Sequence, residues 1–174
     1  PGRLRMLPLI ESARGLLAAA ELALTPRVAR LGIGEADLIA DLRMEPGPAR
    51  GELLPRRLQV VTACAAAGIG APVAPTSTDF RDLAAFRQST QALVRLGFRA
   101  RTAIHPAQVA AINEILSPSA QDIARARRLV TAFEAARSRG DSVTTDEDGR
   151  MVDVAVVRAA REVLVRAGRS PGPA

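Results

Sequence analysis

Apolar residues form four short runs along the first two thirds of the chain, and each run is followed by a stretch with apolar residues at helical spacing. The expected strands are 7–10, 28–33, 70–76 and 101–104, and the expected helices are 12–24, 54–67, 79–96 and 107–116. Pro and Gly at 46–51 interrupt the second unit, and Gly97 ends the third helix. Four alternating strand and helix units predict an α/β fold with a parallel sheet and right-handed crossovers.

The pattern changes in the last third of the chain. Ser117-Pro118 predicts a helix start, with the serine as cap, and this helix is expected to continue to about Arg139. A small hairpin is expected around Asp148-Gly149, and Asp153 opens a last helix, 154–167. The expected parts are therefore 1–116 with the strand and helix units, 117–168 as a helical extension with the hairpin, and 169–174 as a disordered tail.

The composition is that of a globular protein, because 48% of the 174 residues are apolar and 24% are charged. Such a chain can bury a core, which excludes a disordered segment and a disulfide-held scaffold. No apolar run reaches the roughly 20 residues that span a bilayer, and no secretory leader is recognisable, so we expect a cytoplasmic protein without membrane contact. The single cysteine, Cys64, excludes an internal disulfide and a cysteine metal cluster, and its Ala-rich setting predicts an inert helix thiol.

The net charge of +6 comes entirely from arginine, since all 24 basic residues are Arg and none is Lys. These arginines are scattered in ones and twos, and the chain has four Phe but no Tyr or Trp on which bases could stack. No basic stripe or nucleic-acid motif is present, so we expect no nucleic-acid partner. Some of these arginines are better suited to binding a small molecule that carries phosphate.

Two carboxylates, Glu11 and Asp37, come just after expected strands and are 26 residues apart, the length of one strand and helix unit. In a parallel barrel the carboxyl ends of the strands meet at one mouth, where the loops carry the active site. Two carboxylates there suit Mg²⁺, which often keeps several waters beside one or two carboxylates. An acid after a strand can equally cap the next helix or interact with its dipole, so the spacing alone leaves both interpretations open.

The segment Gly34, Glu35, Ala36 and Asp37 lies at a strand-to-helix turn, where backbone N–H groups can bind an anion. Gly32 and Gly34 do not form a dinucleotide fingerprint, and no phosphate-loop sequence occurs. Enzymes that use NAD or ATP are therefore disfavoured.

His105 and Asp153 each have a structural and a catalytic interpretation. His105, the only histidine, could act as a general base, but we favour a buried histidine that bonds to the backbone at a strand-to-helix turn, because no nucleophile can be paired with it. Asp153 directly precedes a helix, and its residue type alone favours an N-cap. Asp79 and Asp82 are expected to act as caps or first-turn acids in the same way.

Several motifs in this order resemble the citrate lyase beta subunit-like branch of the HpcH/HpaI aldolase and citrate lyase superfamily. They are Leu9-Ile10-Glu11-Ser12-Ala13-Arg14-Gly15, Gly34-Glu35-Ala36-Asp37-Leu38, Thr78-Asp79-Phe80-Arg81-Asp82-Leu83, Gly97-Phe98, Ala103-Ile104-His105-Pro106-Ala107-Gln108 and Gly149-Arg150-Met151-Val152-Asp153. The resemblance covers nearly the whole chain, and the last two motifs indicate the branch that acts on CoA thioesters.

The resemblance implies a carbon-carbon lyase with a TIM-type (β/α)8 barrel. Such an enzyme cleaves or forms a hydroxyacyl-CoA of the malyl-CoA or citramalyl-CoA type, giving acyl-CoA and an oxo-acid, with Mg²⁺ as cofactor. On the matching positions, Glu11 and Asp37 become metal ligands, and the backbone from Gly34 to Asp37 holds a carboxylate of the oxo-acid. Asp153 becomes a catalytic residue that a neighbouring subunit contributes, as in a trimer-type homo-oligomer.

The chain also departs from the family pattern. It matches barrel strands five to eight and the C-terminal extension of the family. Strands one to four are therefore expected to be missing, and with them the arginine that in this family stabilises the thioester enolate formed when the carbon-carbon bond breaks. A complete barrel takes about 250 residues. Other departures are Ala74-Pro75 in place of an aspartate-glycine pair and Arg101 in place of a lysine. After Asp153, Val154-Ala155 stands in place of the commoner small residue and proline. A half barrel leaves sheet edges and an apolar inner face open, so we expect association.

Two alternatives to this function stay open. The chain could be a non-catalytic remnant or interaction subunit with the same fold. It could also belong to an oxo-acid aldolase that does not use CoA, although the C-terminal motifs disfavour this.

Overall fold

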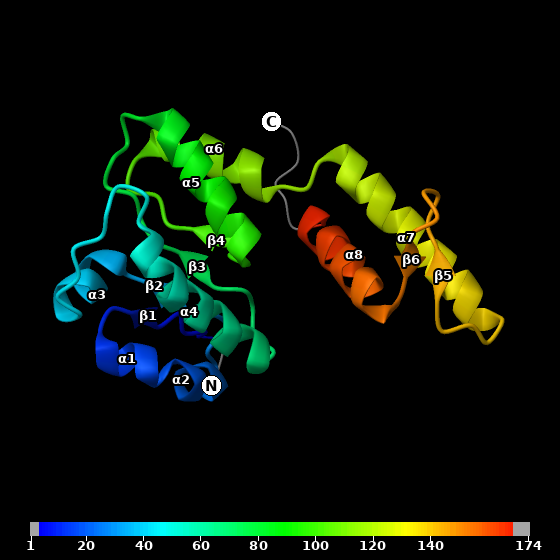
Figure 1. Ribbon diagram of the computed structural model, residues 1–174, viewed down its shortest axis with the longest axis horizontal. Coiled ribbons are helices and arrows are strands. Elements are labelled where there is room, and N and C mark those ends of the chain that lie inside the picture. The colour runs from blue at the N-terminus through cyan, green and yellow to red at the C-terminus, as the bar shows by residue number, and fades with distance from the viewer. Residues whose placement is uncertain (1–3, 169–174) are drawn as a thin grey trace. The chain divides into compact units, whose positions relative to one another are not determined.

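A computed structural model describes residues 4–168 of the chain, which divides after Leu116 into two compact units (Figure 1). The first unit holds a four-stranded sheet with its helices, and the second holds two helices and a hairpin. Within the described range, no helix is both long and apolar enough to cross a membrane.

The sheet of the first unit is parallel, as predicted, and its strands follow one another in chain order (Figure 1). The strands are β1 (Leu9–Ile10), β2 (Gly32–Ile33), β3 (Val73–Ala74) and β4 (Ala100–Arg101). Leu9 pairs with Gly32, Gly32 with Val73, and Val73 with Ala100, so these four residues form one row across the sheet. The fourth strand was expected at 101–104, but pairing ends at Arg101. The strands between residues 4 and 168 do not close into a barrel.

The helices of the first unit are α1 (Ala13–Leu17), α2 (Ala19–Leu24), α3 (Glu35–Asp41), the 3₁₀ turn η1 (Gly51–Leu53), α4 (Leu54–Ala66), α5 (Leu83–Leu96) and α6 (Pro106–Leu116). The single helix expected over 12–24 is wrong, because the backbone leaves helical geometry at Ala18. Helix α3 was not among the expected helices, because the segment from Gly34 to Asp37 was interpreted as a turn.

Helix α5 begins at Leu83, four residues later than predicted, because two aspartates shape the turn before it. The Asp82 side chain accepts a hydrogen bond from the Ala85 N–H at 2.9 Å, which makes it the N-cap. The Asp79 carboxylate accepts from the N–H groups of Arg81 and Asp82, and these bonds lower the pKa of Asp79 below its ordinary value. The cap interpretation is confirmed for Asp82, whereas Asp79 lies before the helix and holds the preceding turn.

One face of the sheet carries the core, and the other is exposed at its β1 edge. The core joins side chains of β1 to β3 with those of the surrounding helices, among them Ile10, Leu16, Leu31, Ile33, Val60, Cys64, Ala74, Leu93 and Phe98. On the opposite face of the β1 segment, Leu7 and Leu9 are 45% and 53% exposed. The β1 segment therefore presents an apolar surface on the face away from the core.

The second unit consists of α7 (Ala120–Ser138), an antiparallel hairpin of β5 (Thr144–Thr145) and β6 (Met151–Val152), and α8 (Val154–Ala167). Its core is formed by Phe133, Val152 and Val157. Ser119, and not Ser117 as predicted, caps α7, because Ser119 and Asp122 form a reciprocal capping box. The hairpin at Gly149 is confirmed, whereas the tail predicted over 169–174 lies outside the described residues.

Candidate active site

Glu11 and Asp37 lie at the carboxyl edge of neighbouring strands. Glu11 directly follows β1, and Asp37 stands in the first turn of α3, which begins two residues after β2. The Gly34 N–H donates to the Ile10 carbonyl at 3.0 Å, which holds the start of α3 against the end of β1. Both carboxylates are exposed, and neither forms a hydrogen bond or ion pair with another described side chain. Their oxygens are thus available to a ligand.

The Glu11 side chain extends across Gly34. A Cβ added at Gly34 would lie 2.7 Å from Glu11 Cγ and would overlap the carboxylate. Only a residue without a side chain therefore fits beside Glu11 in this arrangement. A side chain at this position would therefore act through close approach, since the φ of −100° is open to any residue, and the exposed Glu11 side chain would have to move.

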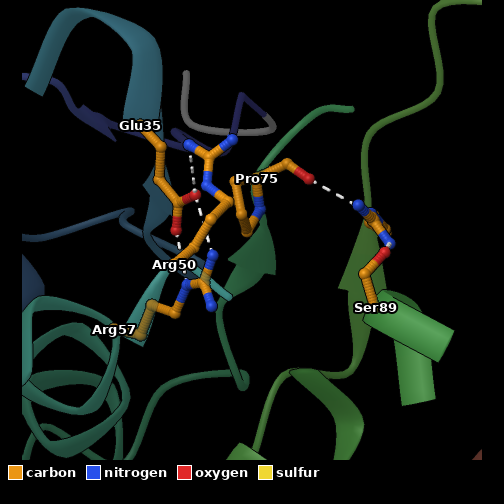
Figure 2. Close-up of polar contacts among 6 residues, drawn as sticks. Glu35, Arg50, Arg57, Pro75 and Ser89 are labelled. Carbon is orange, nitrogen blue, oxygen red and sulfur yellow. Dashed lines mark hydrogen bonds and ion pairs between the residues drawn. The ribbon is translucent and has the colours of Figure 1, made fainter. Parts of the chain in front are cut away.

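The Glu35 side chain points into the protein, which the sequence did not predict. It is 6% exposed, and its two oxygens accept from Arg57 Nε at 2.6 Å and from Arg57 Nη2 at 2.9 Å (Figure 2). Arg50 Nη2 lies 3.4 Å from Glu35 Oε2. The backbone of Glu35 stays part of the predicted anion-binding turn, while its carboxylate joins a buried ion pair. The Arg56-Arg57 pair in the sequence was the available signal for this partner.

Arg101 joins the ends of β3 and β4 to α5. Its Nε donates to the Pro75 carbonyl at 3.1 Å, and its Nη1 donates to Ser89 Oγ at 2.9 Å and to Thr90 Oγ1 at 2.5 Å. Figure 2 shows Pro75 and Ser89 on the two sides of this link. Burial lowers the pKa of Arg101 to about 10, so the guanidinium is still charged at neutral pH.

His105 and Gln108 hold the turn between β4 and α6. His105 Nδ1 accepts from the Ala107 N–H at 3.1 Å, and its ring stacks on Phe80 with centroids 4.5 Å apart. The predicted backbone bond is present, although His105 is partly rather than fully buried. Gln108 is fully buried, accepts from the Ile104 N–H and donates to the Ser77 carbonyl, which ties this turn to the loop after β3.

Asp153 lies in the second unit, where it caps α8. Its Oδ1 accepts from the Val156 N–H at 2.9 Å. The structure thus shows the cap, and the role of Asp153 in a neighbouring subunit stays a prediction. Among residues 4–168, no three His, Cys, Asp or Glu side chains gather as a metal cluster.

The fold and the site define an α/β protein with a pair of exposed carboxylates at the carboxyl edge of a parallel sheet. A sequence model of the HpcH/HpaI aldolase/citrate lyase family matches residues 1–106, and the chain belongs to this family.

The chain is similar in sequence to proteins named as lyases. The chain is 34% identical to the citrate lyase subunit beta of Escherichia coli K12 over 96% of its own length and 55% of that protein. It is 35% identical to the L-malyl-CoA/beta-methylmalyl-CoA lyase of Cereibacter sphaeroides over 91% of its length and 54% of that protein. The chain therefore spans about half the length of these relatives.

Solved structures agree with the fold. The protein CitE from Mycobacterium tuberculosis, in complex with magnesium, acetoacetate and coenzyme A, aligns with a TM-score of 0.75 and 28% identity over 96% of this chain and 62% of that one. A citrate lyase from Burkholderia xenovorans aligns with a TM-score of 0.79 and 25% identity over 97% of this chain and 54% of that one.

Proposed function

We propose that the chain is part of a Mg²⁺-dependent carbon-carbon lyase that cleaves or forms a hydroxyacyl-CoA of the malyl-CoA or citramalyl-CoA type. The observation that carries this proposal is the position of Glu11 and Asp37 after neighbouring parallel strands, two exposed carboxylates that have no side-chain partner among residues 4–168. The lyase names of the relatives and the magnesium and coenzyme A in the CitE complex support it.

The residues present fit a magnesium ion. Carboxylate oxygens are hard ligands, and two of them with open access to water match the way Mg²⁺ is usually held. Glu11 and Asp37 would hold the ion, which, when bound, supplies Lewis-acid polarisation of the hydroxyl and carboxylate oxygens of the substrate.

The backbone from Gly34 to Asp37 would orient the oxo-acid by donating hydrogen bonds to its carboxylate. Helix α3 has no side-chain cap at Gly34, so the first N–H groups of this turn are not used by a capping residue. Asp153 would serve as the catalytic carboxylate in the site of a neighbouring copy, in a trimer-type homo-oligomer.

We further propose that the chain supplies the C-terminal half of the barrel and completes its site with further strand and helix units. The open apolar face beside Leu7 and Leu9 and the half-length match to the relatives support this view. The same two observations favour the second candidate, a non-catalytic remnant of the same fold.

Calorimetric titration with Mg²⁺, with and without glyoxylate or pyruvate, tests the proposal. We expect saturable binding that is lost in Glu11→Ala and in Asp37→Ala while thermal melting stays cooperative. Glu21→Ala, which removes an exposed acid on α2, is the matched control and should bind as the unaltered chain does.

Unchanged affinity in both site variants would remove the metal assignment. If the folded, unaltered chain does not bind Mg²⁺, the proposal of a non-catalytic remnant is favoured. If binding then appears when the complementary barrel half is added, the lyase proposal is favoured again.

A further inference from the structure

The buried Glu35 carboxylate connects three segments of the first unit. Glu35 is the first residue of α3, Arg57 belongs to α4, and Arg50 immediately precedes η1 (Figure 2). Arg57 donates two parallel hydrogen bonds to the carboxylate, at 2.6 and 2.9 Å, and such fork geometry fixes direction as well as distance. The start of α3 is therefore anchored to α4 by a paired, directional contact.

Helix α3 needs such an anchor because it has only seven residues, Glu35–Asp41. Isolated helices of this length are marginal in water, so tertiary contacts must decide where the helix lies. Its two buried side chains are Glu35, at the first position, and Leu38. Leu38 contributes apolar burial without a fixed direction, whereas the Glu35 ion pair specifies an orientation.

The direction of Glu35 also decides where Asp37 points. Successive residues of an α-helix are turned by about 100°, so a residue two positions on points to nearly the opposite side of the axis. With Glu35 turned inward to Arg57, Asp37 is turned outward, which agrees with its exposure. A helix rotated about its axis would move Asp37 away from the edge that it shares with Glu11.

Arg50 adds a second, more exposed contact to the Glu35 carboxylate. Arg50 has φ 52° and ψ 32°, a left-handed conformation that is costly for a residue with a side chain. Its Nη2 lies 3.4 Å from Glu35 Oε2, and its side chain is about half exposed. Arg43 has nearly the same φ, 53°, and forms no hydrogen bond or ion pair with another described side chain.

We propose that Glu35 is a positioning residue of the active site: through Arg57 and Arg50 it fixes the rotation of α3, and so presents Asp37 and the turn at Gly34 beside Glu11. This inference rests on the proposed function, since it assigns Glu35 to the metal and oxo-acid site. A structural role alone would affect stability but not the ligand affinity of a folded chain.

The test compares Glu35→Gln and Arg57→Lys with the unaltered chain. The control is Glu114→Gln, which breaks the exposed Arg87 to Glu114 pair, 2.7 Å, between α5 and α6. Mg²⁺ affinity is measured by calorimetry well below the melting temperature of each variant. We expect about tenfold weaker binding in both site variants, as for other residues that orient metal ligands, and no change in the control.

Amide hydrogen exchange gives a second measurement that needs no metal. The N–H groups of Leu38 and Leu42 bond to the carbonyls of Gly34 and Leu38, so their exchange rates report whether α3 is held in place. We expect faster exchange at these two amides in Glu35→Gln, with the amides of α4 and α5 unchanged. Arg57→Lys keeps the charge and provides the same test if Glu35→Gln does not fold.

Native Mg²⁺ affinity together with native exchange in a folded Glu35→Gln chain would overturn the proposal, whatever its melting temperature. If the unaltered chain binds no Mg²⁺, that result bears on the proposed function alone, and exchange in α3 then decides whether Glu35 positions this turn. Arg50→Gly should weaken Mg²⁺ binding, whereas Arg43→Gly, which relieves the same backbone conformation without touching Glu35, should not. Equal effects of these two variants would contradict the role of Arg50.

Discussion

The Glu11 side chain occupies the space that a side chain at Gly34 would need. Glu11 Cγ would lie 2.7 Å from an added Cβ, closer than carbon atoms approach without displacement. The two residues come from neighbouring strand ends and are joined through the bond from the Gly34 N–H to the Ile10 carbonyl. The conformation of Glu11 is therefore coupled to the absence of a side chain at Gly34.

Gly34→Ala should displace the Glu11 carboxylate and weaken Mg²⁺ binding. The added methyl group fits the backbone, whose φ is −100°, so the effect comes from overlap with the exposed Glu11 side chain, which can move; the free energy of unfolding should change by about 0.5 kcal/mol or less. Calorimetry and denaturant unfolding measure the two effects. Gly51→Ala is the control because nothing lies within 4 Å of its added Cβ, and equal Mg²⁺ affinity in both variants would contradict the prediction.

Asp153→Asn should separate the cap from the catalytic role. Asparagine caps helices about as well as aspartate, so the free energy of unfolding should change little, whereas turnover of malyl-CoA or citramalyl-CoA should fall sharply. Asp153→Ala should lose both turnover and about 1 kcal/mol of stability. These measurements need a preparation that turns over substrate, and full activity of Asp153→Asn there would leave Asp153 a simple N-cap.

Arg101→Met should destabilise the first unit by about 2–3 kcal/mol, because charged hydrogen bonds to Pro75, Ser89 and Thr90 are lost. Arg101→Lys should cost less, since an ammonium can still reach some of these acceptors but cannot reproduce the planar fork. Denaturant unfolding checks both values. Arg95→Met, an exposed position on α5, should lie within about 0.5 kcal/mol of the unaltered chain.

Ser119→Ala should destabilise α7 by about 1 kcal/mol at neutral pH, and Ser119→Asn should recover most of this. Hydrogen bonds from the Ser119 hydroxyl and N–H lower the pKa of Asp122. A carboxylate with a lowered pKa stabilises the fold above its unfolded pKa, about 3.9, and loses this contribution as the pH falls through its folded pKa. The stability difference between the unaltered chain and Ser119→Ala should therefore shrink below about pH 4, and a constant difference would exclude this link.

The open face of the sheet predicts association of the isolated chain. Leu7 and Leu9 are about half exposed, and apolar patches of this kind pair with other surfaces. Sedimentation velocity should show species larger than a monomer, reduced in Leu7→Ser with Leu9→Ser but not in Leu17→Ser on α1. A monodisperse monomer with cooperative melting would defeat the prediction.

The order and approximate positions of the strands could be predicted, because apolar runs such as 28–33 are a local signal. Within that run, the paired strand is Gly32–Ile33. The outward carboxylates of Glu11 and Asp37 could also be anticipated, since parallel strands bring their carboxyl ends to one edge. The Glu35 to Arg57 pair could not, because it joins residues 22 positions apart whose approach depends on how α3 and α4 pack. The predicted cap at Ser117 was wrong for a different, local reason, because the capping box of Ser119 with Asp122 outweighs the serine-proline pattern.

The sequential order of the strands has a consequence for how such a chain can change in length. Each strand is paired with its neighbour in the sequence, and within residues 4–168 the outer edges of β1 and β4 carry no further strand. A parallel strand with its crossover helix can join either edge without breaking an existing ladder bond. Gain or loss of whole strand and helix modules is therefore the length variation that this architecture accommodates best.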